Sequence, residues 1–284
     1  MVRTLIIAIC FVCLASTTWA AAWFTDGFES GDLTHTENGA NWFEGSYPEA
    51  TVSSTVARTG TYSARFRYAS GVNAEQRFDL GANKTDVWIR YYVYFPANYT
   101  HKTTTSYNDK FIRLWSDNSN YTGDRVKVGS SLYYDSAYKA QVVLEAYETY
   151  PDNLSCSLSG TSMDVLTSWG HWHLTADDLE RWIEFKFHFK VDSGAGDGAL
   201  EMYVDGVKQI GDTSLSWASA PCANPYFRTG YLFGYAYTSA ILTENMDIYV
   251  DDFTLSDTDP GSGDTPATPS PGLTGVTTSG ITIR

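Results

Sequence analysis

Polar side chains that can bind a sugar or move a proton alternate along one stretch in the middle of the chain. They are Lys139, Gln141, Glu145 and Tyr147. Because successive side chains of a β-strand point to opposite faces, these four would share one face of a strand at 139–148. We interpret this face as a sugar-binding surface, with an ordinary solvated sheet face as the alternative.

Two histidines separated by one residue form the most suggestive local feature. In an extended segment the imidazoles of His171 and His173 point the same way, so His173 is a candidate general base and the pair are candidate metal ligands. No third ligand follows at a spacing familiar from zinc sites. His188 is a second candidate base, and histidines without a catalytic role are the simpler interpretation.

Paired carboxylates would indicate a different chemistry. A retaining glycosidase needs two carboxyl groups about 5 Å apart. Glu145 and Glu148 fall on opposite faces of one strand, so they do not form such a pair. A pair of Glu145 with Glu75 or Glu184 depends on how the strands assemble, and the sequence leaves it open.

The elements that position these residues are strands. The chain repeats a period-two alternation and shows almost no helical periodicity, most clearly at 181–191, where every second residue from Ile183 to Val191 is apolar. That segment predicts a half-buried antiparallel strand. Similar patterns predict strands at 61–68, 75–80, 87–95, 110–116, 126–134, 139–148, 200–205, 226–237 and 246–255. Asp205-Gly206 predicts a hairpin turn, and Thr175 is the predicted cap of a helical turn at 175–180.

Many short strands in one chain of this length predict an all-β fold, a two-sheet antiparallel β-sandwich of the jelly-roll type. We expect one such domain at 23–256. Residues 257–284 are rich in Pro, Gly, Ser and Thr and are predicted to be a linker or tail.

The first 22 residues have the pattern of a signal peptide: Arg3, an apolar run at 5–14, and small residues up to Ala20 and Ala22. We therefore expect a secreted, extracellular protein. Removal of the signal peptide leaves two cysteines, Cys156 and Cys222. An export route permits one disulfide between them. Two free thiols are the alternative.

Net charge restricts the partners. A formal charge of −14 argues against nucleic acid and anionic membrane. The 20 Tyr and 9 Trp offer flat faces on which sugar rings can pack. We expect a polysaccharide partner and a monomeric protein.

Six motifs, taken in order, resemble the concanavalin A-like jelly rolls of secreted glucanases, lectins and polysaccharide lyases. They are FTDGFESGD (24–32), ARTGTYSARF (57–66), EQRFDL (75–80), WIRYYVYFP (88–96), LEMYVDG (200–206) and IYVDDF (248–253). Their order is most similar to the heparin-lyase and glucuronan-lyase branch. The Glu-x-Asp-x-x-Glu strand of the glucanases is missing.

Two further stretches resemble strands of jelly-roll alginate lyases, namely 77–80 (RFDL) and 226–230 (YFRTG). The strand at 111–115 (FIRLW) lacks the Gln and His that those enzymes carry. The resemblance therefore does not supply the base, which must come from elsewhere in the chain.

The resemblance implies a polysaccharide lyase that cleaves a uronate-containing polymer by β-elimination. This reaction needs a cation or amide that neutralises the uronate carboxylate and a base that removes the α-proton. The candidate catalytic residues are Arg77, Arg113, His173, Gln141 and Tyr147, and the candidate substrate-binding residues are Glu75, Lys110, Glu145 and Lys139. For Arg77 or Arg113, a structural ion pair with Glu75 or Asp79 is the alternative.

Pairing of the first and last strands, as in related sandwiches, would bring four acidic residues together. We expect Asp26, Glu29, Asp251 and Asp252 to hold a structural Ca²⁺, with Glu29 and Asp252 as first ligands. Acidic turn residues in water are the alternative. The alternation slips by one residue before Phe253, which predicts a β-bulge there.

Three other functions stay open on the sequence. A noncatalytic carbohydrate-binding module tethered by the tail fits the missing catalytic signature. A glycoside hydrolase requires a carboxylate pair assembled across strands. A structural adhesion domain requires neither a catalytic signature nor a carboxylate pair.

Overall fold

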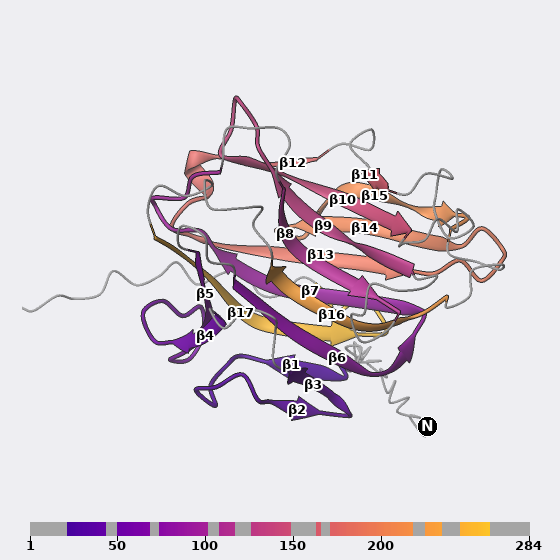
Figure 1. The fold of residues 1–284 in the computed structure, drawn as a ribbon, viewed down its shortest axis with the longest axis horizontal. Helices are drawn as coiled ribbons and strands as arrows, with labels where there is room; N and C mark the ends of the chain where they lie inside the picture. Colours follow the sequence, from indigo (N-terminus) through magenta and orange to yellow (C-terminus); the bar gives the residue numbers. More distant parts are fainter. Residues whose placement is uncertain are drawn as a thin grey trace, which may run out of the picture.

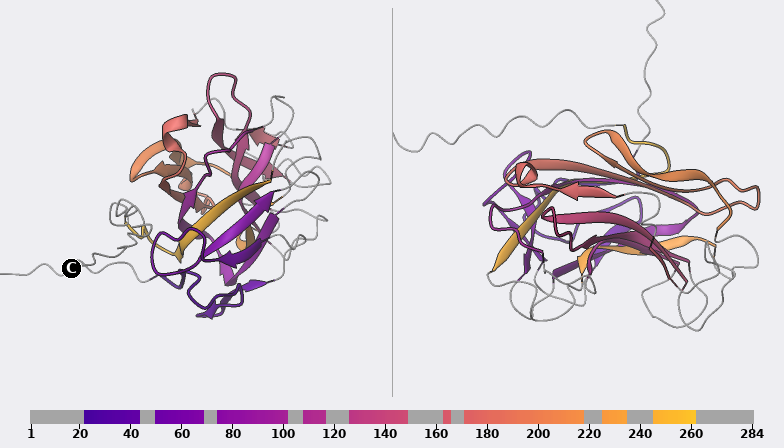
Figure 2. Two further views of the ribbon diagram at one scale, coloured as in Figure 1. Left: turned by 90° about the vertical axis from the view of Figure 1, so that its left-hand side faces the viewer. Right: turned by 90° about the horizontal axis from the view of Figure 1, so that it is seen from above.

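The structure, a computed structural model, describes residues 22–43, 50–68, 74–101, 108–116, 126–148, 163–165, 171–217, 225–234 and 245–261. Two antiparallel sheets pack face to face as two layers (Figures 1 and 2). The predicted all-β jelly-roll sandwich is confirmed. No helix in the described part of the chain is long and apolar enough to cross a membrane.

The first layer is the eight-stranded sheet. Its order is β15 (Val207–Leu215), β14 (Gly198–Val204), β13 (Trp182–Lys190), β7 (Asp86–Tyr94), β17 (Met246–Ser256), β5 (Ser63–Tyr68) and β4 (Ala50–Ser53), with β1 (Phe24–Asp26) paired to β17. The predicted pairing of the first and last strands of the sandwich, β1 and β17, is thus present.

The second layer is the nine-stranded sheet, which lies towards the viewer in Figure 1. Its order is β11 (Met163–Val165), β10 (Ala140–Glu148), β9 (Val126–Tyr133), β8 (Asn108–Trp115), β16 (Phe227–Gly234), β6 (Ala74–Lys84), β3 (Ala40–Phe43) and β2 (Thr36–Glu37), with β12 (Trp172–Leu174) paired to β10. Because β8 and β16 are neighbours here, residues more than 100 positions apart in sequence lie side by side.

The core fills the space between the inner faces of the two sheets. Phe111 of β8 lies edge-on against Phe185 of β13, with ring centroids 4.8 Å apart. Each fully buried aromatic or aliphatic side chain of this kind stabilises the fold by about 1.5–3 kcal/mol.

The prediction that β13 is half-buried is wrong, because both of its faces are covered. Glu184, Lys186 and His188 are 3 %, 4 % and 8 % exposed. Lys186 Nζ pairs with Asp259 at 2.7 Å, and the His188 ring stacks on Trp88 with centroids 4.0 Å apart. Polar side chains on an outer face are buried here because ion pairs and stacking cover them.

Three local predictions are confirmed. Asp205 and Gly206 both have positive φ, 47° and 76°, as a two-residue hairpin turn requires. The bulge lies where the register of β17 and β7 shifts between Asp251 and Thr254. Thr175 caps the 3₁₀ turn η3 (Ala176–Asp178) through the Asp178 carboxylate.

Candidate active site

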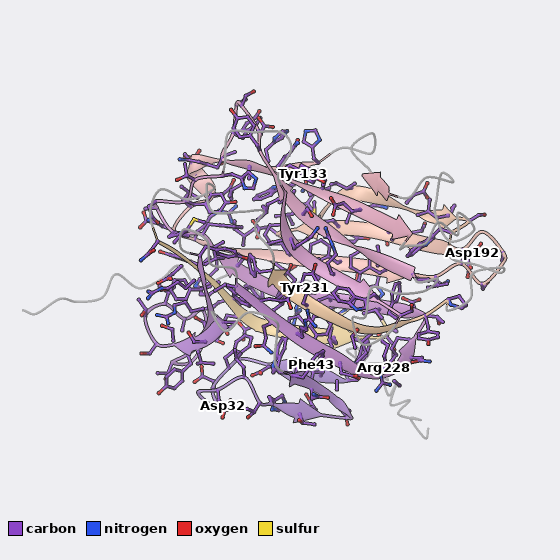
Figure 3. All side chains as sticks on the ribbon, in the orientation of Figure 1. Asp32, Phe43, Tyr133, Asp192, Arg228 and Tyr231 are labelled. Atoms are coloured by element: carbon purple, nitrogen blue, oxygen red, sulfur yellow. The ribbon has the colours of Figure 1, made fainter. Side chains whose placement is uncertain are left out.

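A line of mostly charged and aromatic residues crosses the outer face of the nine-stranded sheet. The register aligns Glu145, Gly129, Arg113, Tyr231 and Arg77 on the neighbouring strands β10, β9, β8, β16 and β6. We call these five residues the charged row. Neighbouring strands are about 4.8 Å apart, so the row is continuous across the sheet. Figure 3 shows where Tyr231 of this row lies on the nine-stranded sheet.

The central contact of the charged row is a buried ion pair. One guanidinium nitrogen of Arg113 contacts Glu145, and both side chains are 0 % exposed. The strand between them carries Gly129, where an added Cβ would stand 2.8 Å from Arg113 Nη1. Glycine therefore leaves the space through which the guanidinium reaches across β9.

Glu145 also holds a tyrosine on this face. The Tyr133 hydroxyl donates to Glu145 Oε1 at 2.6 Å, and the Ser131 hydroxyl donates to Oε2 at 2.8 Å. Tyr133 itself is half-buried. It lies two residues from Ser131 and four from Gly129 on β9, so it shares the face of the charged row. The carboxylate thus orients a phenol that solvent reaches, while Arg113 balances its charge.

At the other end of the row, Arg77 Nε donates to Glu75 Oε1 at 2.5 Å. Their side chains are 14 % and 5 % exposed. The structural ion pair that the sequence left open for Arg77 is therefore present. The neighbouring Tyr231 ring meets Trp115 edge-on, with centroids 4.8 Å apart.

The remaining predicted residues of this face lie around the charged row. Lys110 is half-buried on β8 opposite Ser131, and Gln141 lies in register between β9 and β12. Lys139 is half-buried just before β10. Tyr147 lies on β10, but its side chain is outside the described residues.

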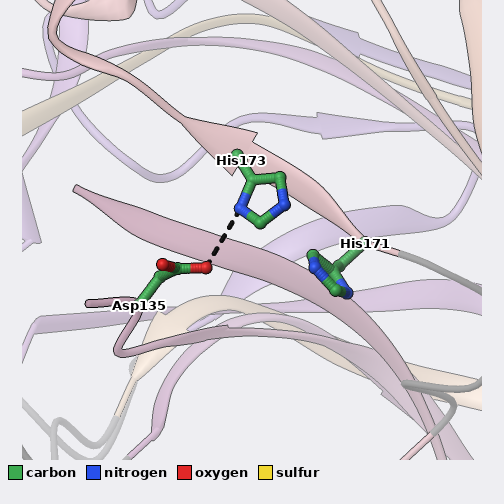
Figure 4. A group of neighbouring side chains, drawn as sticks. All are labelled: Asp135, His171 and His173. Atoms are coloured by element: carbon green, nitrogen blue, oxygen red, sulfur yellow. Dashed lines mark ion pairs between the residues drawn. The ribbon is translucent and has the colours of Figure 1, made fainter. Parts of the chain in front are cut away.

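His173 lies beside the face at one end of β10, where it pairs in register with Gln141. Its Nδ1 is 3.1 Å from Asp135 Oδ2, and its ring is 4.4 Å from that of His171 (Figure 4). Burial and the neighbouring His171 lower the pKa of His173, against the opposite effect of Asp135. The two histidines do point the same way, and Asp135 is a third partner that the sequence did not reveal.

His188 lies on the outer face of the other sheet, so it does not join the charged row. Its Nδ1 is 2.8 Å from Glu201 Oε2, and its Nε2 is 2.8 Å from Asp86 Oδ1. Burial disfavours the charged imidazolium, but these two hydrogen bonds outweigh it and raise the pKa of His188.

No carboxylate pair of the glycosidase kind forms among Glu75, Glu145 and Glu184. Glu184 lies on β13 of the opposite sheet, where Tyr92 donates to it at 2.7 Å. Glu75 and Glu145 are separated by four strand spacings, roughly 19 Å. The 5 Å separation that a retaining glycosidase needs is therefore not available to them.

The four predicted calcium ligands all accept hydrogen bonds from the protein. Asp26 accepts from Trp42 Nε1 at 2.6 Å, and Glu29 accepts two backbone amides. Asp251 accepts the Arg58 amide at 2.7 Å, while Asp252 pairs with the Arg58 side chain. Calcium binding by these residues stays a prediction.

Several predictions fall outside the described residues. Cys156 and Cys222, the N-terminal segment 1–21 and the tail beyond Gly261 all belong to this part of the chain. The beginning of the predicted tail is described, and it lies against the eight-stranded sheet, where Asp259 pairs with Lys186 of β13 at 2.7 Å.

A family model described as polysaccharide lyase matches residues 28–253, which is most of the chain and nearly all of the sandwich. The chain belongs to the polysaccharide lyase family. A comparison with curated proteins returned no match.

Solved structures similar to this polysaccharide lyase share its fold at low identity. The alginate lyase Aly36B has a TM-score of 0.53 at 14 % identity, covering 84 % of this chain and 95 % of that one. The alginate lyase vAL-1 from Chlorella virus scores 0.55 at 14 % identity, covering 78 % and 93 %. An endo-β-1,4-glucuronan lyase from the fungus Trichoderma reesei scores 0.55 at 11 % identity, covering 86 % and 100 %.

Sequence reasoning about this polysaccharide lyase did not single out Tyr133, Ser131 or Tyr231. Tyr133 and Ser131 alternate with core residues in the predicted strand 126–134, so the same period-two argument would have placed them on the polar face. Tyr231 directly follows the 226–230 motif. What the sequence lacked was any sign that Tyr133 and Glu145 touch.

Proposed function

We propose that this polysaccharide lyase cleaves a uronate-containing polymer by β-elimination on the outer face of the nine-stranded sheet. Three of the similar structures are lyases named after alginate or glucuronan, and both of these are uronate polymers. The observation that carries the proposal is the Tyr133 hydroxyl, held 2.6 Å from Glu145 on the face that also carries Arg77 and Lys110.

The carboxylate of the substrate must be neutralised before the neighbouring proton becomes acidic. Lys110 supplies this charge, because it is half-buried on β8 opposite Ser131, beside the strand of Tyr133. Arg77 is paired with Glu75 on β6, three strands from β9, so it binds the carboxylate of another sugar of the same polymer. Arg113 is fully buried, so its role is to hold Glu145 in place. A fixed cation beside the developing carbanion stabilises the transition state without reorganisation.

Tyr133 acts as the base. Its own hydroxyl proton passes to Glu145, along the 2.6 Å hydrogen bond, as the phenolic oxygen removes the α-proton of the uronate. The electron pair of that C–H bond forms a C=C bond, and the C–O bond to the next sugar breaks. The leaving oxygen takes the proton from Tyr133, and Glu145 returns a proton to the phenol.

Lyase activity is tested by the ultraviolet absorbance of the unsaturated product with a panel of uronate polymers. We expect a rise with one polymer, and a fall of at least about 100-fold in kcat for Tyr133→Phe. Arg77→Ala is expected to lower kcat/KM. Matched controls are Tyr94→Phe and Arg65→Ala on the opposite sheet, which should behave as the wild type.

A flat trace across the panel, with binding of the same polymers retained, would contradict the lyase proposal. A carbohydrate-binding module would then be the better account. Full activity in Tyr133→Phe would contradict only the choice of base, and His173→Gln would be the next variant to measure.

We also propose that the protein is secreted, with cleavage after Ala20 or Ala22, and that Cys156 and Cys222 form a disulfide. The apolar run at 5–14 followed by small residues supports the first part, and the two remaining cysteines support the second. Mass spectrometry of protein collected from the medium, with and without reduction, tests both. An intact Met1 or two alkylatable thiols would contradict them.

A further inference from the structure

Two histidines and an aspartate converge at one end of the nine-stranded sheet. Asp135 follows β9, while His171 and His173 lie on either side of Trp172 in and before β12. One ligand atom from each of the three lies within 4.8 Å of the others, and no other such group of three occurs in the described part of the chain. Figure 4 shows the three side chains around one space. We propose that Asp135, His171 and His173 bind a Zn²⁺ ion.

The distances suit an ion of this size. A tetrahedral Zn²⁺ with bonds of about 2.0–2.1 Å has ligand atoms about 3.3 Å apart. His173 Nδ1 and Asp135 Oδ2 are already 3.1 Å apart. The rings of His171 and His173 stand at 85° to each other with centroids 4.4 Å apart. All three ligand atoms lie within 4.8 Å of one another, so side-chain rotations that move an atom by at most about 1.5 Å bring every pair into the same range.

The donor set selects the class of ion. Two imidazoles and one carboxylate favour Zn²⁺ and similar transition ions, whereas Ca²⁺ and Mg²⁺ prefer a shell of oxygen ligands. Three protein ligands leave a fourth position for water or an anion. The Asp135 and His173 side chains are 16 % and 30 % exposed, so an ion can enter from solvent.

The site has a defined place in the fold. Asp135 extends from β9 and the histidines from β12, and both strands pair with β10 on opposite sides. A bound ion therefore joins two strands that are not themselves neighbours. The Tyr138 ring, 4.0 Å from that of His173, restricts the orientation of the imidazole.

Isothermal titration calorimetry of the tag-free, chelator-treated full chain with ZnCl₂ tests the proposal, independently of lyase activity. We expect one saturable site per chain, and affinity at least about 100-fold weaker in His171→Ala. His35→Ala is the matched control: His35 lies 3.8 Å from Glu37, but among the described residues it belongs to no cluster of three possible metal ligands. This control should bind as the wild type does.

Two further measurements complete the test. Co²⁺ should give the visible absorption of a four-coordinate site in the wild type and lose it in Asp135→Asn. CaCl₂ in about 100-fold excess should not displace Zn²⁺. Equal Zn²⁺ affinity in His171→Ala and His35→Ala, or no saturation with Zn²⁺ at all, would overturn the proposal. Circular dichroism of the metal-free variants verifies that each is folded.

Discussion

The buried ion pair of Arg113 and Glu145 leads to a prediction that separates stability from activity. Both side chains are 0 % exposed, so Glu145→Met leaves the Arg113 charge buried without its ion partner. Breaking a buried pair in this way costs about 3–5 kcal/mol. For a chain of this size, about 2–4 °C per kcal/mol corresponds to a melting temperature lowered by roughly 6–20 °C.

The double variant Arg113→Met, Glu145→Met should recover most of that loss. Replacing a buried ion pair by apolar side chains of similar volume is often neutral. The hydroxyl of buried Ser131 loses its acceptor, which costs about 1–3 kcal/mol. We therefore expect the double variant within about 3 kcal/mol of the wild type, yet with activity still at least about 100-fold lower, because Tyr133 is no longer oriented.

Urea unfolding followed by tryptophan fluorescence, together with the lyase assay, measures both quantities. The control is Arg67→Met, which removes an ion pair whose arginine is 43 % exposed and should cost less than about 1 kcal/mol. If Glu145→Met costs no more than this control, the pair does not contribute as a buried pair. Wild-type activity in the double variant would show that Glu145 does not orient the base.

Three further predictions concern other parts of the molecule. In Gly129→Ala a Cβ would overlap the Ile112 carbonyl and crowd Arg113, so we expect a loss of about 1–3 kcal/mol in urea unfolding; a wild-type midpoint would contradict the tight crossing. Because the pKa of His188 is raised in the folded protein, its protonation stabilises the fold fully below pH 6.5, the pKa of the unfolded chain, and this contribution is lost as the pH rises through the higher folded pKa. In His188→Gln the difference in unfolding free energy between about pH 6 and pH 9 should therefore be smaller than in the wild type. An unchanged difference would contradict this account of His188. If calcium binds as predicted, it should raise the melting temperature of the wild type and not of Asp252→Asn, and an equal response would count against that site.

Local features followed from the sequence because short-range physics decides them. The alternation in 87–95 and 200–205 identified strands, since each side chain of a strand alternates between faces. Asp205-Gly206 identified a turn whose two residues need positive φ. The slip before Phe253 identified the bulge. Each of these depends on neighbours only a few residues apart.

Burial of polar faces could not be predicted in the same way. The alternation in β13 indicated one solvated face, but Lys186 is covered by Asp259, more than 70 residues further on. Whether a polar side chain is solvated or paired depends on which distant segment lies over it. Hydrophobic pattern carries no information about that segment.

The sequence by itself determined the all-β class, most of the long strands and the set of side chains that share an outer face. Only the tertiary structure decided which of those side chains meet. Arg113 reaches Glu145 because β9 places Gly129 between them, and Asp135 reaches His173 because β9 and β12 flank β10. The physical reason is that side-chain alternation fixes the face of a residue along its own strand. The lateral order of strands is instead set by long-range pairing, which also sets the contacts that carry the chemistry.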